Sequence, residues 1–385
     1  MKMEKYVVRG NKKVSSYIHY DLCLSILSNL SLKSLKRFEC VCKSWIRLLE
    51  NPNFKSLFRK SFLSNNHCYY DDSFVLIHQY MNNDQSMMYS FSGERFENRT
   101  KLDWPNPFQE VDPKFYISGA NSIKGIFCLI NYSQPDIRVL LWNPTTGEFK
   151  VVPTSPNEFV PNMDFDAAQY GFGYDSFSDD YKVIRCVLMS SEDLSLDPFW
   201  EIYSLKSNSW KQREFDIPIN YDENGVSLEG VVYWYGENEE NEDYDEAYIY
   251  SFDLNSEKFV TTPLPLTDDN FDFNFVCRGL VVLNGSIALI SNYTNIYSFH
   301  VAILGEIGVR ESWFKLFIVQ YLPCINYPIG FGKNGDIFFI TKDGKLVYYD
   351  LRTKMMKELS FLGDRFMGNI ITYKKNLLPI RELNE

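Results

Sequence analysis

Residues 18–62 read IHYDLCLSILSNLSLKSLKRFECVCKSWIRLLENPNFKSLFRKSF, and this stretch decides the fold of the N-terminal part of the chain. Apolar residues recur in it at steps of three and four, the spacing that places side chains on one face of a helix. They are Leu35, Phe38, Cys42, Trp45 and Leu49. The pattern predicts one long helix that ends at Asn51, because the residue before Pro52 is forced out of the α conformation.

A shorter helix is expected on each side of the long one. Asp21 can place negative charge or a capping oxygen at the first helix start, and Ser31 or Ser34 can cap the next helix. The helix before the long one is expected to carry Leu22, Ile26, Leu27 and Leu30 on one face, and the helix after it carries Phe54, Leu57, Phe58 and Phe62. Basic residues, Lys36, Arg37, Lys43 and Arg47, form the outer face of the long helix. Three short helices cannot bury this apolar surface among themselves, so the module needs a partner surface.

This stretch resembles the F-box, and the resemblance holds residue by residue. The matching residues are Asp21-Leu22, Ile26-Leu27, Lys33-Ser34-Leu35, Arg37-Phe38, Cys40-Val41-Cys42-Lys43-Ser44-Trp45 and Asn51-Pro52-Asn53-Phe54. The chain departs from the family pattern at His19 and Ser31, where plant members commonly have prolines. The resemblance implies that the module docks a Skp-type adaptor, which links it to a cullin scaffold and a ubiquitin-charged conjugating enzyme.

The resemblance also implies which residues supply the adaptor site. They are Ile18, Asp21, Leu22, Ile26, Leu27, Leu30, Leu35, Phe38, Val41, Cys42 and Trp45. The alternative is that these helices form an ordinary bundle packed on their own downstream domain.

Composition limits the rest of the chain. Its 385 residues, 45% hydrophobic and 16% aromatic, are enough for a small module and one large globular domain, and the Tyr and Phe content favours β structure. There is no long apolar run and no apolar signal region, so neither a membrane span nor a secretory signal is expected. Eight scattered cysteines without a C-x-x-C pair predict no zinc site and no disulfide frame. We expect a protein of the cytoplasm or nucleus that needs no cofactor.

Charge divides the chain into two parts. Residues 1–60 contain 13 Lys and Arg against 4 Asp and Glu, whereas residues 61–385 contain 26 against 46. An acidic large domain argues against nucleic acid as its partner and is compatible with a basic protein partner. Seven of the acids lie within residues 236–246, GENEENEDYDE, which we interpret as a solvated insertion between two strands, with a partner-binding loop as the alternative.

A repeated unit organises the chain beyond residue 71. An aromatic residue, a polar turn and a large apolar residue seven positions later recur at Trp142–Phe149, Tyr203–Trp210, Phe252–Phe259 and Tyr349–Met356. Each is expected to be the tip of a β-hairpin. A longer copy is expected near Phe299 to Trp313 and a degenerate one near Phe91, and glycine-marked strand pairs open the units. A period of 40 to 60 residues with four strands per unit is typical of a β-propeller.

The sequence therefore predicts a six-bladed propeller, with two stacked sandwich domains as the alternative. The first unit has only three convincing strands, and an unpaired edge there would be exposed. We expect residues near Met367 to Tyr373 to complete that unit, so that the C-terminal strand closes the domain.

The large domain resembles the F-box-associated, kelch-related domain of plant F-box proteins, including the S-locus F-box-like group. The residues that carry this resemblance are 140–153, 170–185, 201–211 and 225–234. The expected organisation is a flexible N-terminus at 1–16, an F-box at 17–62 and the propeller domain at 63–385.

Catalytic motifs are absent from the sequence. Gly330 to Gly335 matches G-x-G-x-x-G, but a phosphate-binding loop must open a helix and a strand follows here. The four histidines form no metal or triad pattern. The resemblances thus imply a non-catalytic substrate-recognition subunit of a Skp–cullin–F-box ubiquitin ligase, which selects an unknown target for ubiquitination and proteasomal degradation. The alternatives are an F-box protein that acts outside a ligase and a carbohydrate-active propeller enzyme.

Overall fold

A computed structural model describes most of the chain. The described residues are 6–7, 14–15, 20–41, 43–64, 73–80, 86–92, 96, 98–105, 115–131, 138–160, 163–191, 196–215, 217, 225–238, 246–265, 276–293, 296–320, 324–332, 336–351, 353–359, 370–377 and 380. Two-residue strands, β1 (Tyr6–Val7) and β2 (Val14–Ser15), pair ahead of the helices.

The helical module contains α1 (Tyr20–Leu27), α2 (Leu32–Glu39), α3 (Lys43–Leu49) and α4 (Pro52–Ser64). The expectation of one long helix through Phe38 and Trp45 is wrong, because the chain turns after Glu39. The backbone N–H groups of Cys40 and Val41 bond to carbonyls three residues back, which tightens and ends α2. Pro52 begins α4, as a proline at a first helical position can.

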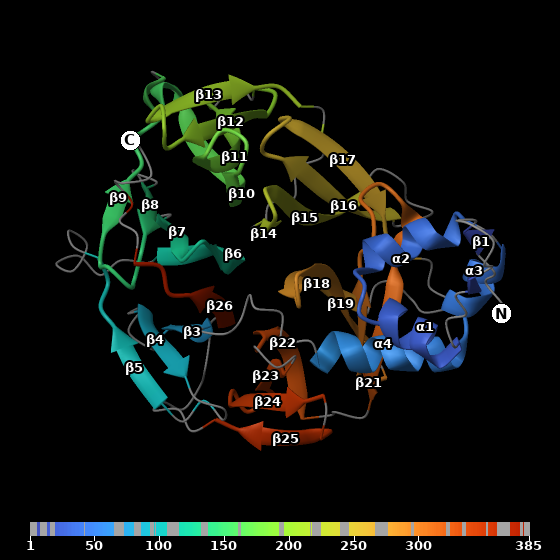
Figure 1. Ribbon diagram of the computed structural model, residues 1–385. Coiled ribbons are helices and arrows are strands. Elements are labelled where there is room, and N and C mark those ends of the chain that lie inside the picture. The colour runs from blue at the N-terminus through green and yellow to red at the C-terminus, as the bar shows by residue number, and fades with distance from the viewer. Residues whose placement is uncertain are drawn as a thin grey trace.

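Four sheets of the large domain are four-stranded antiparallel meanders, and Figure 1 shows the sheets arranged around a central axis. Their strands are β10 (Asp164–Asp175), β11 (Asp180–Ser190), β12 (Phe199–Ser204) and β13 (Ser209–Arg213); β14 (Val226–Leu228), β15 (Val231–Asn238), β16 (Glu246–Asp253) and β17 (Lys258–Pro263); β18 (Val276–Leu283), β19 (Ser286–Tyr293), β20 (Ser298–Ile303) and β21 (Phe314–Gln320); and β22 (Ile325–Phe331), β23 (Ile337–Thr341), β24 (Leu346–Asp350) and β25 (Met355–Glu358).

The fifth sheet has eight strands in the order β5-β4-β3-β26-β6-β7-β8-β9. The strands are β3 (Ser73–Tyr80), β4 (Ser86–Ser92), β5 (Asn98–Leu102), β6 (Phe115–Ile123), β7 (Ile126–Asn131), β8 (Arg138–Trp142), β9 (Phe149–Val151) and β26 (Ile370–Lys374). The described strands of this domain thus form five sheets, and the expected six separate units are a wrong count. The reason is β26, which pairs antiparallel with β3 and meets β6 in parallel at Thr372 and Asn121.

The repeated aromatic units lie where the sequence places them. Their first and last residues face each other across the third and fourth strands of a meander, as Trp142↔Phe149, Tyr203↔Trp210, Phe252↔Phe259 and Tyr349↔Met356. The longer copy is the β20–β21 hairpin, where Ile303 faces Phe314. The prediction of hairpin tips is confirmed.

Burial follows strand position within a sheet. The second strands, such as β7 and β23, are almost entirely buried because neighbouring sheets cover both faces. At one such seam Trp200 of β12 packs edge-on to Trp234 of β15, with ring centroids 5.8 Å apart. A Cβ on Gly171 would lie 2.5 Å from Val232 and 2.8 Å from the Trp234 ring, so this seam requires glycine.

The outermost strands of the sheets, such as β5 and β13, are mostly exposed and carry Lys and Arg, which protect a sheet edge from unwanted pairing.

A buried ion cluster holds the link into β10. Arg185 and Glu201, each 1% exposed, pair at 2.8 Å, and Arg185 also pairs with Glu158 at 2.7 Å. Glu158 lies in the 3-10 helix η2 (Pro156–Phe159), whose cap residue Ser155 donates to Glu201. The Arg185 guanidinium lies 4.1 Å from the centroid of the Trp210 ring. Burial by itself would lower the pKa of Arg185, but the surrounding acidic groups outweigh it and raise the pKa, so the guanidinium stays charged.

We predict that Arg185→Leu destabilises the domain by about 3–5 kcal/mol, because it leaves two carboxylates without their cation in the interior. The matched control is Arg213→Leu, which breaks the Arg213–Glu257 pair at about 30% and 26% exposure and should cost less than about 1 kcal/mol. Urea unfolding of both variants measures the difference. Equal costs would contradict the assignment of the Arg185 cluster as a buried, coupled site.

Candidate functional site

The helical module packs against the large domain through α4. Phe54, Phe58 and Phe62 are buried and belong to one apolar cluster with residues of β18–β25. Phe58 meets the Phe314 ring of β21 edge-on, with centroids 5.1 Å apart. In Figure 1 the helices overlap the sheet of β18–β21 and extend beyond it at the right of the ring. The partner surface that the helices require is thus provided in part by the chain's own propeller.

Polar contacts fix the orientation of the module. Arg59 donates to the carbonyl of Lys315 at 3.2 Å, and the Asn284 amide donates to the carbonyl of Phe62 at 2.8 Å. A Cβ on Gly305 would lie 3.2 Å from Leu32 of α2. One of these residues, Asn284, lies in the β18–β19 turn, and Gly305 and Lys315 lie in or beside the β20–β21 connection. In an antiparallel meander these two connections lie at the same end of the sheet. We name this end of the domain the module end.

The shape of the module depends on a cap and an aromatic stack. Ser31 caps α2, since its side chain accepts from the Ser34 N–H at 3.3 Å, which selects Ser31 from the two predicted caps. Phe38 of α2 stacks on Trp45 of α3, with centroids 5.1 Å apart and planes inclined by 17°. The two predicted residues therefore do share a face, although they belong to different helices.

The residues predicted for the adaptor site divide into two groups. Leu27 and Leu35 are core, at 4% and 3% exposure, and Leu30, Phe38 and Trp45 are partly buried against the same cluster. Exposed residues of the set are Leu22 at 59%, Ile26 at 57% and Val41 at 64%, together with Asp21. Ile18 and Cys42 lie outside the described residues.

The inward face of α1 differs from the predicted one. Leu22, Ile26, Leu27 and Leu30 were expected to share a face, but Leu24 and Leu27 are buried while Leu22 and Ile26 face solvent. The periodicity of α1 is ambiguous because both i,i+4 and i,i+3 apolar pairs occur in it. An exposed apolar pair on a rigidly packed helix is suited to contact another protein.

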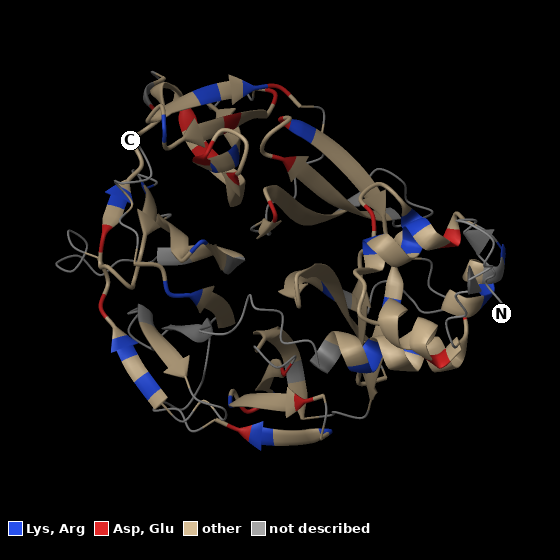
Figure 2. Cartoon of the chain, viewed as in Figure 1, with Lys and Arg blue, Asp and Glu red and all other residues tan. Residues whose placement is uncertain are grey.

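The outer surface of the module is basic. Arg37, Lys43 and Arg47 are exposed, whereas Lys36 is partly buried and pairs with Glu39 at 3.2 Å. Figure 2 shows basic segments on the helices of the module. The predicted basic face is thus present at three of its four positions.

Three other kinds of site concern the described part of the chain: a metal site, a membrane-spanning helix and a phosphate-binding loop. No group of three or more His, Cys, Asp or Glu there could hold a metal ion. No described helix is both long and apolar enough to cross a membrane. The G-x-G-x-x-G match begins at Gly330 within β22 and is followed by β23, which pairs with β22, so a strand and not a helix follows it.

Comparison with known proteins identifies the family. The family model described as "F-box associated beta propeller domain" matches residues 92–374, and the one described as "F-box domain" matches residues 17–57. The chain belongs to the F-box proteins with an associated β-propeller domain.

Similar proteins from Arabidopsis thaliana agree with this assignment. F-box protein CPR1 is 26% identical over 368 residues, which cover 89% of this chain and 84% of CPR1. The protein At3g16210 is 26% identical over 259 residues, which cover 66% of this chain and 62% of that protein, so the match spans less than two thirds of this relative. Among solved structures, TolB from Acinetobacter baumannii has a TM-score of 0.47 at 11% identity, over 83% of this chain and 73% of TolB.

We predict that Phe58→Ala destabilises the module by about 3–5 kcal/mol, because the buried ring fills the contact between α4 and β21. The neighbouring Leu57, 41% exposed, provides the control, and Leu57→Ala should have little effect. Urea unfolding and limited proteolysis report the two costs. A module that is equally stable in both variants would show that the α4 interface does not hold it.

Proposed function

We propose that this protein is the substrate-recognition subunit of a Skp–cullin–F-box ubiquitin ligase. The observation that carries the proposal is an F-box module whose exposed apolar side chains, Leu22, Ile26 and Val41, remain uncovered after α4 has packed on the propeller. One surface of the same four helices therefore serves the fold while another is left for an adaptor. The two interpretations of the helical stretch, F-box and bundle packed on its own domain, are compatible.

The division of roles follows from this arrangement. The module holds a Skp-type adaptor and, through it, a cullin, while the propeller holds a target protein for ubiquitination. Ubiquitin transfer itself belongs to other subunits, so the chain acts without catalysis of its own. A cytoplasmic or nuclear location fits this role.

Packing of α4 also supports a rigid receptor. Aromatic contact through Phe58 and hydrogen bonds through Arg59 and Asn284 join the module to the propeller. The adaptor and the target would then be held at a set distance and orientation, which favours transfer to a limited set of target lysines.

Adaptor binding is tested with Leu22→Ser combined with Ile26→Ser. Loss of two apolar contacts should weaken binding of a purified Skp-type adaptor by at least about tenfold, while thermal unfolding stays unchanged because both side chains are exposed. Leu57→Ser, an exposed apolar change on α4, is the matched control and should bind normally. Calorimetry gives the affinities. Wild-type affinity in the double variant would remove α1 from the adaptor site, and a wild-type chain that binds no adaptor would refute the ligase role.

We further propose that β26 closes the propeller. It supplies the strand next to β3, in register from Ile370↔Ile77 to Lys374↔Ser73, so the two ends of the domain are joined by backbone hydrogen bonds. Beyond it, Ile380 is 2% exposed in the cluster between β6–β9 and β10–β13, and its N–H donates to Glu148 at 2.8 Å.

Two truncations test closure. Deletion of residues 366–385 should lower the unfolding temperature and make the whole domain sensitive to protease, because it opens a sheet seam and exposes the edge of β3. Deletion of residues 381–385 alone should be harmless, since β26 and Ile380 remain. A domain that stays folded and protease-resistant without residues 366–385 would show that closure does not depend on β26.

A further inference from the structure

Two apolar side chains are conspicuously exposed at the module end, on sheets away from the F-box. Phe177 is 85% exposed and Leu377 is 80% exposed, the highest values among the large apolar residues that the structure describes. Phe177 lies in the turn between β10 and β11, and Leu377 follows β26. Neither contributes to the core, so the fold gives no reason for either to be apolar.

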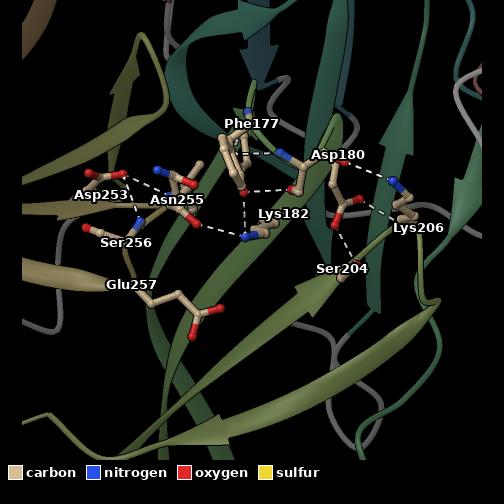
Figure 3. Close-up of polar contacts among 12 residues, drawn as sticks. Phe177, Asp180, Lys182, Ser204, Lys206, Asp253, Asn255, Ser256 and Glu257 are labelled. Carbon is tan, nitrogen blue, oxygen red and sulfur yellow. Dashed lines mark hydrogen bonds and ion pairs between the residues drawn. The ribbon is translucent and has the colours of Figure 1, made fainter.

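The turn that presents Phe177 is held by several hydrogen bonds (Figure 3). The Asp175 carboxylate accepts from the N–H of Phe177 at 2.9 Å, from the Ser178 hydroxyl at 2.7 Å and from the Lys182 ammonium at 2.9 Å. Lys182 also donates to the carbonyl of Leu254 in the next sheet, at 2.8 Å. Burial acts to raise the pKa of Asp175, but these hydrogen bonds outweigh it and lower the pKa. Phe177 is thus held in solvent by a fixed backbone, which reduces the entropy lost on binding.

Lysines lie on both sides of this turn. The Lys206 ammonium donates to the carbonyl of Ser178 at 3.0 Å. On the other side, the Lys124 ammonium lies 3.2 Å from the centroid of the Tyr174 ring, and the Tyr174 hydroxyl donates to Asp179. Both lysines are exposed, and each is positioned by a contact with the Phe177 turn or the residue before it.

The segment after β26 brings Leu377 to the same surface. Asn376 donates to the carbonyl of Lys124 at 2.6 Å and accepts from the Asn143 amide at 2.9 Å. Gly125 has a φ of +80°, and a Cβ there would lie 2.5 Å from that of Asn376, so the segment lies directly on the β6–β7 turn. Lys374 and Lys375, both exposed, precede Asn376.

This surface is basic although the domain is acidic. Among the described residues, four exposed lysines, Lys124, Lys206, Lys374 and Lys375, lie beside the apolar pair, against two exposed acids, Asp179 and, in the adjoining β14–β15 turn, Glu229. The neighbouring Asp175 and Asp180 are buried at 2% and 4%, where Asp175 accepts from the Lys182 ammonium and Asp180 accepts from the Ser204 hydroxyl and the Lys206 N–H. Figure 2 shows basic segments beside β6 and β26, in line with this distribution. The surface is therefore complementary to a negatively charged ligand that also carries apolar groups.

We propose that Lys124, Phe177, Lys206, Lys374, Lys375 and Leu377 form a docking surface for an acidic segment of a partner protein. Phe177 and Leu377 contact apolar side chains of that segment, and the lysines attract its carboxylates and set its orientation. The inference deepens the proposed function, since in a ligase this partner would be the target, but the docking itself does not require an adaptor.

The experiment selects peptides from a random phage-displayed library on the full-length chain and measures the recovered peptides by fluorescence anisotropy. Recovered sequences should combine Asp or Glu with large apolar residues. Binding should weaken at least about tenfold in the double variant Phe177→Ser, Leu377→Ser and in the double variant Lys124→Gln, Lys206→Gln. It should also weaken when the salt concentration is raised.

Two variants serve as controls. The double variant Lys211→Gln, Lys258→Gln removes the same charge from exposed positions on β13 and β17 and should leave binding unchanged. Val260→Ser, at 43% exposure on β17, is the apolar control.

Several outcomes would overturn the proposal. They are recovery of no acidic peptides, equal binding to the surface variants and the controls, or tighter binding of a single-stranded oligonucleotide or an anionic vesicle at the same lysines. Adaptor affinity, measured on the same variants, should stay at the wild-type value. Peptide docking without adaptor binding would refute the ligase role and leave this surface in place, whereas adaptor binding without docking would do the reverse.

Discussion

A sheet whose two faces are both apolar must be covered on both sides, and this constraint shapes the whole domain. The second strands of the meanders are almost completely buried, so each sheet needs a neighbour against each face. Sheets arranged around an axis satisfy this requirement without leaving a face bare. The seam between Trp200 and Trp234 shows how close the contact is, because Gly171 has no room for even one more carbon.

The same constraint explains where the helical module lies. Its apolar residues exceed what four short helices can bury together, and Phe54, Phe58 and Phe62 extend the apolar cluster of β18–β25 outward. The module therefore shares a hydrophobic core with the propeller and is not a separately packed domain. What remains exposed on it, above all Leu22, Ile26 and Val41, is then available to a partner without cost to the fold.

Electrostatics divides the acidic domain into distinct regions. Charges that enter the interior, as in the Arg185 cluster and the Lys182–Asp175 pair, are neutralised by close partners. Lysines on the outer strands protect sheet edges, and the lysines around Phe177 form a local basic surface against the net charge of the chain. Net charge alone therefore gives an incomplete description of which partners the domain can attract.

Features that depend on short-range chemistry were predictable from the sequence. A β-hairpin depends on a turn and the two residues that face each other across it. The pairs from Trp142↔Phe149 to Tyr349↔Met356 could therefore be predicted from the repeated sequence unit. The cap at Ser31 and the start of α4 at Pro52 are equally local. Tertiary structure decided the buried face of α1 and the joining of two units by β26, because each depends on contacts with residues far away in the chain. The break at Cys40 is made by local hydrogen bonds, but the apolar periodicity runs through it without a signal. Periodicity shows that a helix has an apolar stripe, but only the packed neighbours determine which apolar side chains are covered and which, like Leu22 and Phe177, are left for a partner.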